Sequence, residues 1–273
     1  MPHVRAGEVE VYWERHGEGE PVLLVQGLGA NHRFWAPLLP IFTSRAQVIL
    51  ADWPGTGLSG DFSPQTEVST ANLADALVAV LDAAGAERAH VVGRSMGGCI
   101  AQQIAIRHPA RTRSLVLAST WARADPFLAA VLSSWPEILE AGGDALLLSQ
   151  ASFWAFPREF YSPEYRREER EVADVIAHAI EIPQRPKEFK RLAAAGVEHD
   201  SVPHLHSITA PTTVAVGDDD ILTPPFLARP LYQLIPGARL ARIEGAGHGF
   251  YEQLPRKFAD LVFDTWSRAS LGV

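Results

Sequence analysis

The sequence has a single cysteine and no long apolar run. With Cys99 alone, no disulfide can form within the 273 residues, so the strongest mark of a secreted protein is missing. No stretch approaches the ~18 uncharged apolar residues of a membrane span, and residues 1–13 contain no apolar signal-peptide core. These absences predict a cytoplasmic protein that does not bind a membrane.

Charge of one sign is not concentrated anywhere either. The chain has 24 lysines and arginines against 32 aspartates and glutamates, a formal net charge of −8. The charged run at residues 166–171 mixes both signs and is typical of a solvated helix face. An electrostatic basis for binding nucleic acid is therefore weak. We expect a small-molecule substrate as the partner, and the sequence leaves open whether the chain forms a homodimer.

Strand and helix patterns alternate over residues 1–120 and again from residue 208. Such alternation predicts an α/β fold, with a mostly parallel central sheet flanked by helices. Amphipathic periodicity predicts helices at residues 69–84, 97–107 and 255–268. Short apolar runs predict strands at residues 9–15, 21–25, 47–50, 90–93, 115–118, 212–216 and 239–243.

Residues 121–207 break this alternation, because their periodicity is helical and predicts no strand. A segment without a strand cannot extend the sheet, so we expect it to cover the carboxyl ends of the strands, where ligands bind in open parallel sheets. The chain then consists of an α/β core, residues 1–120 and 208–273, and a helical cap, residues 121–207. Prolines are expected to divide the cap into short helices; they stand at positions 126, 136, 157, 163, 183 and 186.

The run Gly93-Arg94-Ser95-Met96-Gly97 matches G-x-S-x-G, the sharp turn that presents a nucleophilic serine. The match follows a predicted strand and opens a predicted helix, which makes it far more specific than the pattern alone. Its glycines have a physical reason, since the turn leaves no room for Cβ atoms two positions either side of the serine. Ser95 is therefore the candidate nucleophile.

A serine nucleophile needs a base, and the base needs a carboxylate to orient it, in the chain order Ser, Asp or Glu, His. His248 follows the last predicted strand in a glycine-rich loop. Three consecutive aspartates follow the strand before it, and the spacing favours Asp220, which begins Asp-Ile-Leu-Thr-Pro. Asp218 and Asp219 are the alternatives.

Metal and nucleotide sites find little support in the sequence. His199, His204 and His206, with Asp200, fit no spacing typical of a metal site. No G-x-G-x-x-G phosphate loop is present. We therefore expect a protein without a metal or another cofactor.

Taken together, the motifs resemble the α/β-hydrolase superfamily over nearly the whole chain. Within it, the chain most resembles the branch of 3-oxoadipate enol-lactonases and aminoacrylate hydrolases, through Ser119-Thr120-Trp121, Phe153-Trp154-x-Phe156-Pro157 and Glu198-His199-Asp200-Ser201. The superfamily motifs are Gln26-Gly27-Leu28-Gly29, Asp52-Trp53-Pro54-Gly55-Thr56-Gly57-Leu58-Ser59, the turn at Ser95, Gly217-x-x-Asp220-x-Leu222-x-Pro224 and Gly247-His248.

The resemblance implies a serine hydrolase that cleaves an ester, lactone or activated amide, with an oxyanion hole made by the backbone N–H groups of Leu28 and Met96. Gln26 stands where the family more often has histidine, which changes how this loop is braced. Arg94, beside the nucleophile, either binds a substrate carboxylate or forms a structural ion pair. The side chains expected to bind substrate are Gln26, Arg94, Trp121, Trp154 and Phe156.

Other functions use the same residues. Hydrolysis of a C–C bond and perhydrolase or haloperoxidase chemistry are alternatives on the same three side chains. A second alternative is a non-catalytic small-molecule binding protein of this fold, although an intact set of serine, aspartate and histidine argues against it.

Overall fold

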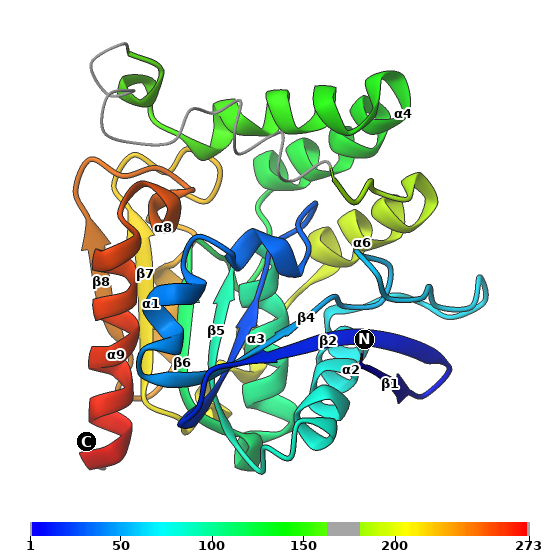
Figure 1. The fold of residues 1–273 in the computed structure, drawn as a ribbon. Coiled ribbons are helices and arrows are strands. Elements are labelled where there is room, and N and C mark those ends of the chain that lie inside the picture. Colours follow the sequence, from blue (N-terminus) through cyan, green and yellow to red (C-terminus); the bar gives the residue numbers. More distant parts are fainter. Residues whose placement is uncertain (1, 163–180, 272–273) are drawn as a thin grey trace.

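The computed structural model describes residues 2–162 and 181–271, in which eight strands form one sheet flanked by helices (Figure 1). The order across the sheet is β1-β2-β4-β3-β5-β6-β7-β8. Strand β2 runs antiparallel to β1 and β4, and all the other pairs are parallel, which confirms the predicted mostly parallel sheet. The strands are β1 (His3–Ala6), β2 (Val9–His16), β3 (Glu20–Val25), β4 (Ala46–Ala51), β5 (Ala89–Arg94), β6 (Thr112–Ala118), β7 (Thr212–Gly217) and β8 (Arg239–Ile243).

Every strand predicted from the sequence is present, and the structure adds β1. Strand β1 has four residues, all of them exposed or half-buried, so it has no apolar run to reveal it. The central strands are buried on both faces. In β3, Val22 and Leu24 pack into one hydrophobic cluster, and Leu23 and Val25 pack into the other. Successive side chains of a strand point to opposite faces, so a continuous apolar run supplies both clusters.

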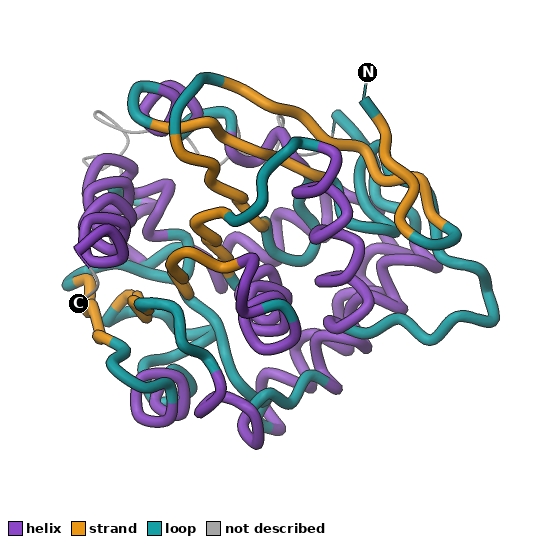
Figure 2. Tube along the Cα trace, turned by 90° about the horizontal axis from the view of Figure 1, so that it is seen from below, coloured by secondary structure: helices purple, strands orange, loops and turns teal. Residues whose placement is uncertain are grey.

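Helices cover both faces of the sheet, as the view from below shows (Figure 2). Helices α2 and α3 pack against each other on one face, and α1 and α9 pack together on the other. These helices are α1 (Leu39–Thr43), α2 (Thr70–Ala83), α3 (Met96–Arg107) and α9 (Pro255–Leu271). The shorter elements of the core are η1 (His32–Trp35), η2 (Pro109–Arg111), α7 (Arg229–Leu234) and α8 (Phe250–Gln253).

The described part of residues 121–207 contains helices and no strand. They are α4 (Pro126–Ala155), η3 (Arg158–Tyr161), α6 (Pro186–Glu198) and η5 (Val202–Ser207). One prediction was wrong: α4 continues through Pro136, and its break lies at Gly143, where φ is +68°. Pro136 is itself buried in this helix, so packing offsets the lost backbone hydrogen bond. The predicted break at Pro163 and the charged run at 166–171 lie outside the described residues.

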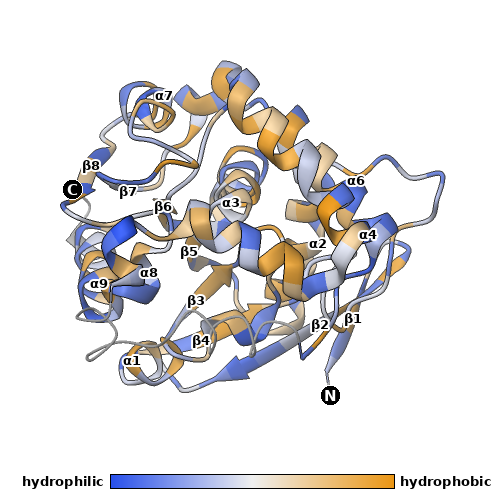
Figure 3. Ribbon diagram, turned by 90° about the horizontal axis from the view of Figure 1, so that it is seen from above, coloured by the Kyte–Doolittle hydropathy of each residue, from blue (hydrophilic) through white to orange (hydrophobic). Residues whose placement is uncertain are grey.

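The described residues of this segment, 121–162 and 181–207 and from here on the insert, lie at the carboxyl ends of the strands, with α4 and α6 above the sheet in Figure 1. Seen from above, β5 and α3 lie between α8 and α6 (Figure 3). Gln184 donates a hydrogen bond to the carbonyl of Gly29 at 3.2 Å, and Arg185 donates one to Gly57 at 3.1 Å. The insert is therefore bound to the loops that follow β3 and β4. No helix among the described residues is long and apolar enough to cross a membrane.

Candidate active site

Ser95 occupies the turn between β5 and α3 in a backbone conformation that residues other than glycine rarely adopt. Its φ is 51° and its ψ is −128°, which is strained for a residue with a Cβ. Hydrogen bonds from neighbouring residues keep the backbone in this strained conformation. The backbone N–H of Ser95 donates to the carbonyl of Ala118 at 2.9 Å, and its own carbonyl accepts from the Thr120 hydroxyl at 2.6 Å. The end of β6 and the loop after it therefore position the candidate nucleophile.

The glycines on either side of Ser95 are required by close backbone contacts. A methyl group on Gly93 would lie 2.4 Å from the carbonyl oxygen of Gly97, and one on Gly97 would lie 2.2 Å from that of Gln26. Both distances are far shorter than any real Cβ contact. The loop after β3 also touches the candidate nucleophile, since a methyl group on Gly27 would lie 3.0 Å from the Ser95 Cβ.

His248 and Asp220 form a buried hydrogen-bonded pair. The Nδ1 atom of His248 lies 3.0 Å from Oδ2 of Asp220, and each residue is only 2% exposed. The backbone N–H groups of Leu222 and Thr223 donate to the same carboxylate at 3.0 and 2.8 Å, so it is held from several sides. With its Nδ1–H donated to Asp220, the ring keeps Nε2 free to accept a proton.

The structure separates the three aspartates that the sequence left as alternatives. Asp218 is half-exposed and pairs with Arg242 at 2.7 Å, and Asp219 is exposed. Asp220 alone of the three is buried and bonded to His248. The loop after β7 therefore brings the expected aspartate to the histidine.

Thr223 belongs to this pair and was not singled out from the sequence. Its hydroxyl lies 2.8 Å from Oδ2 of Asp220 and 3.0 Å from Nδ1 of His248. A hydroxyl has one proton, so Thr223 donates it to Asp220, and the Nδ1–H of His248 is then shared between Asp220 and the Thr223 oxygen. The sequence signal was a threonine three residues after an aspartate, a spacing at which side chains commonly bond local groups.

Leu28 and Met96, the expected oxyanion-hole residues, come from the loop after β3 and from the first turn of α3. Met96 is the first residue of α3, so its N–H has no partner within the helix and lies at the positive end of the helix dipole. Leu28 follows Gly27, the residue that abuts Ser95. Gln26 is fully buried, and its side-chain amide donates to the carbonyl of Ala51 at 3.0 Å. It therefore ties the loop after β3 to the end of β4.

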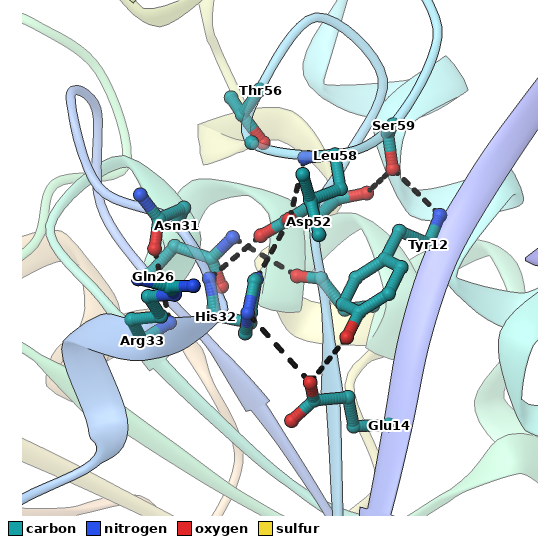
Figure 4. A network of polar contacts seen from close by, with 12 residues as sticks. Tyr12, Glu14, Gln26, Asn31, His32, Arg33, Asp52, Thr56, Leu58 and Ser59 are labelled. Carbon is teal, nitrogen blue, oxygen red and sulfur yellow. Dashed lines mark hydrogen bonds and ion pairs between the residues drawn. The ribbon is translucent and has the colours of Figure 1, made fainter. Parts of the chain in front are cut away.

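A polar network also ties this loop to Asp52, directly after β4, and to β2 (Figure 4). Asp52, fully buried, accepts from the backbone N–H of Leu58 at 2.8 Å and pairs with Nδ1 of His32 at 2.8 Å. The opposite ring nitrogen of His32 lies 3.7 Å from Glu14, which also accepts from the Tyr12 hydroxyl. The sequence showed Asp52 as part of a turn motif and did not reveal these partners.

The expected substrate-binding side chains lie in different surroundings. Trp121 is fully buried and donates to the carbonyl of Gly196 at 3.2 Å, which favours a packing role. Phe156 is buried against the His248 loop, since a methyl group on Gly249 would lie 2.7 Å from its ring. Their contact with substrate stays a prediction. So does that of Trp154, which is half-buried, and of Arg94, which is buried at the end of β5.

Of the three histidines near the end of the insert, His199 is bonded within the chain, and His204 and His206 are exposed. His199 is buried, with Nδ1 2.8 Å from the Thr70 hydroxyl, and burial lowers its pKa to about 4. Asp200 pairs with Arg123. Among the described residues, no group of three or more histidine, cysteine, aspartate or glutamate side chains is arranged to hold a metal ion.

Known proteins with similar sequences and structures agree with this architecture. Residues 20–255 match the α/β hydrolase fold family. A protein of Azorhizobium caulinodans named "Putative carbamate hydrolase RutD" is 35% identical over 263 residues, 96% of this chain and 97% of its own. A hydrolase structure from Pseudomonas aeruginosa superimposes with a TM-score of 0.83 at 25% identity, over 96% of this chain and 97% of that one.

An enol-lactonase structure from Burkholderia xenovorans has a TM-score of 0.84 at 22% identity, and covers 97% of this chain and 100% of its own. At that identity the likeness concerns the fold. The fold predicted from the motifs is thus confirmed by the family match and by solved structures. The chain belongs to the α/β-hydrolase fold family.

Proposed function

We propose that the protein is a serine hydrolase that needs no cofactor, with Ser95 as nucleophile, His248 as general base and Asp220 as the group that orients it. The observation that supports this best is the buried 3.0 Å hydrogen bond between His248 and Asp220. It occurs in a chain whose candidate nucleophile is held at a strained turn. Strain at a sharp turn is what exposes such a serine to substrate and to its base.

The proposed reaction is acyl transfer in two steps. His248 takes the proton of the Ser95 hydroxyl through Nε2 while the oxygen attacks the substrate carbonyl. The N–H groups of Leu28 and Met96 stabilise the resulting oxyanion, and the imidazolium gives its proton to the leaving group. In the second step His248 takes a proton from water while the water oxygen attacks the acyl-enzyme. The bond between the acyl carbon and the Ser95 oxygen then breaks, the imidazolium returns its proton to that oxygen, and the acid leaves.

The proposed substrates are small carboxylic esters, lactones and activated amides. Carbamates fall within this class, because the carbonyl of a carbamate is attacked in the same way. The name of the relative from Azorhizobium caulinodans, "Putative carbamate hydrolase RutD", makes carbamates candidate substrates. We further propose that the insert acts as a cap over Ser95. Its Ala155 carbonyl accepts from the backbone N–H of Gly249 at 2.7 Å, which joins the end of α4 to the loop that carries His248.

The test is covalent labelling combined with turnover. A fluorophosphonate probe should label the wild-type protein and not Ser95→Ala, and p-nitrophenyl butyrate turnover should fall roughly 10⁴-fold in that variant. Ser44→Ala is the matched control, because Ser44 is an exposed serine beyond α1. Equal labelling of Ser95→Ala and wild type would contradict the proposal. Faster turnover of a vinylogous diketone than of any ester would replace it with C–C bond hydrolysis.

A further inference from the structure

Arg94 carries a buried positive charge for which the described residues offer no acidic partner. The side chain is 8% exposed, and its Nε is buried without a hydrogen-bond partner. Its guanidinium carbon lies 4.7 Å from the ring centre of Phe34 and 4.6 Å from that of Tyr251. Over residues 2–162 and 181–271, no carboxylate forms an ion pair with it. The structural ion pair that the sequence left open is therefore not found there.

A buried guanidinium packed against aromatic side chains still needs an anion to accept the hydrogen bonds of its N–H groups. The two aromatic faces stabilise the cation by their negative quadrupoles, but a ring face accepts none of the in-plane N–H bonds of the guanidinium fork. Buried charges in proteins are normally paired and hydrogen-bonded, because desolvation without compensation is costly. Carboxylate geometry matches the fork and takes two parallel bonds.

The position of the guanidinium relates it to the proposed reaction. A methyl group on Gly27 would lie 3.0 Å from the Ser95 Cβ and 3.3 Å from a terminal nitrogen of Arg94. The nucleophile and the cation therefore flank the same residue of the loop that carries Leu28. Tyr251, one of the two rings, follows His248 by three positions and lies in α8.

We propose that Arg94 binds a carboxylate of the substrate, so that the enzyme prefers acyl substrates with a carboxylate a few atoms from the carbonyl that is attacked. This inference rests on the proposed function, since it places the anion beside the Ser95 nucleophile. The rings of Phe34 and Tyr251 lie next to each other, with 5.1 Å between their centres, and both pack against the guanidinium, whose fork is left for the anion.

The test compares two esters of equal length. Mono-p-nitrophenyl glutarate ends in a carboxylate, and the matching p-nitrophenyl ester of glutaramic acid ends in a neutral carboxamide. In wild type, kcat/KM should favour the carboxylate about 10- to 100-fold, the range of a hydrogen bond to a charged group. Arg94→Gln should lower kcat/KM far more for the carboxylate than for the carboxamide and so remove this preference, whereas Arg94→Lys should retain part of it.

Arg107→Gln is the matched control. This variant also removes one positive charge, but at the C-terminal end of α3, about 16 Å along the helix from Met96. The Arg107 side chain is exposed there and pairs with Asp75. The ratio between the two esters should not change in this variant. An unchanged ratio in Arg94→Gln, or a fall in melting temperature with equal loss on both esters, would overturn the inference in favour of a structural arginine.

A binding measurement separates this inference from the proposed function. Glutarate is titrated calorimetrically into Ser95→Ala and into the same protein with Arg94→Gln added. Binding that is lost with Arg94→Gln supports the anion site, even if neither ester is hydrolysed by wild type. No binding to Ser95→Ala, or equal binding to both proteins, contradicts it.

Discussion

Replacing Thr223 by valine removes one hydroxyl from the hydrogen bonds around His248 and nearly keeps the shape of the side chain. The hydroxyl lies 2.8 Å from Oδ2 of Asp220 and 3.0 Å from Nδ1 of His248. A hydrogen bond to a charged group contributes about 1.5–3 kcal/mol. Asp220 keeps its two backbone donors and His248 in the variant. We therefore expect the loss of about 1–2 kcal/mol of transition-state stabilisation, a fall in kcat of about 5- to 30-fold.

The assay is steady-state hydrolysis of p-nitrophenyl butyrate, with the melting temperature measured beside it. Thr223→Ser is the control, because serine keeps the hydroxyl and loses only a methyl group. It should restore most of kcat. A positioning role predicts that kcat falls in Thr223→Val while KM and the melting temperature change little. Wild-type kcat in Thr223→Val, or equal damage in Thr223→Ser, would refute the reasoning.

Three further predictions concern single residues. Asp220→Asn should lower kcat roughly 10⁴-fold, since it misorients the histidine, and Asp218→Asn should leave kcat nearly unchanged; the reverse would show the wrong aspartate. Gly97→Ala should destabilise the fold by about 3 kcal/mol or more, whereas Gly60→Ala, whose methyl would meet its nearest atom at 3.5 Å, should cost much less in a urea titration. Burial lowers the pKa of His199 from 6.5 to about 4, so the unfolded chain binds a proton that the fold does not. Stability should then fall by about 3 kcal/mol as the pH drops from 6.5 to 4, and His199→Gln should flatten this fall. Parallel profiles of the two proteins would contradict it.

The sequence by itself determined the fold class and predicted the residues of the candidate site. Strand, helix and turn patterns are local, since they depend on residues a few positions apart. The run around Ser95 identified a strand, a sharp turn and a helix at once, and chain order indicated where the histidine should follow. For the same reason the half-exposed β1, which has no apolar run, was missed.

Only the tertiary structure decided what depends on contacts between distant parts of the chain. It placed Asp220 rather than Asp218 against a histidine 28 positions further along, and brought Thr223 to the same ring. It showed Trp121 to be packed inside the core and α4 to break at Gly143 instead of at Pro136.

The surroundings of Arg94 were likewise decided only by the tertiary structure. Its neighbours Phe34 and Tyr251 come from elements that precede and follow it by many residues. Whether an arginine is paired depends on every side chain within a few ångströms. Sequence order does not contain those distances, because they arise when the sheet and its helices pack together.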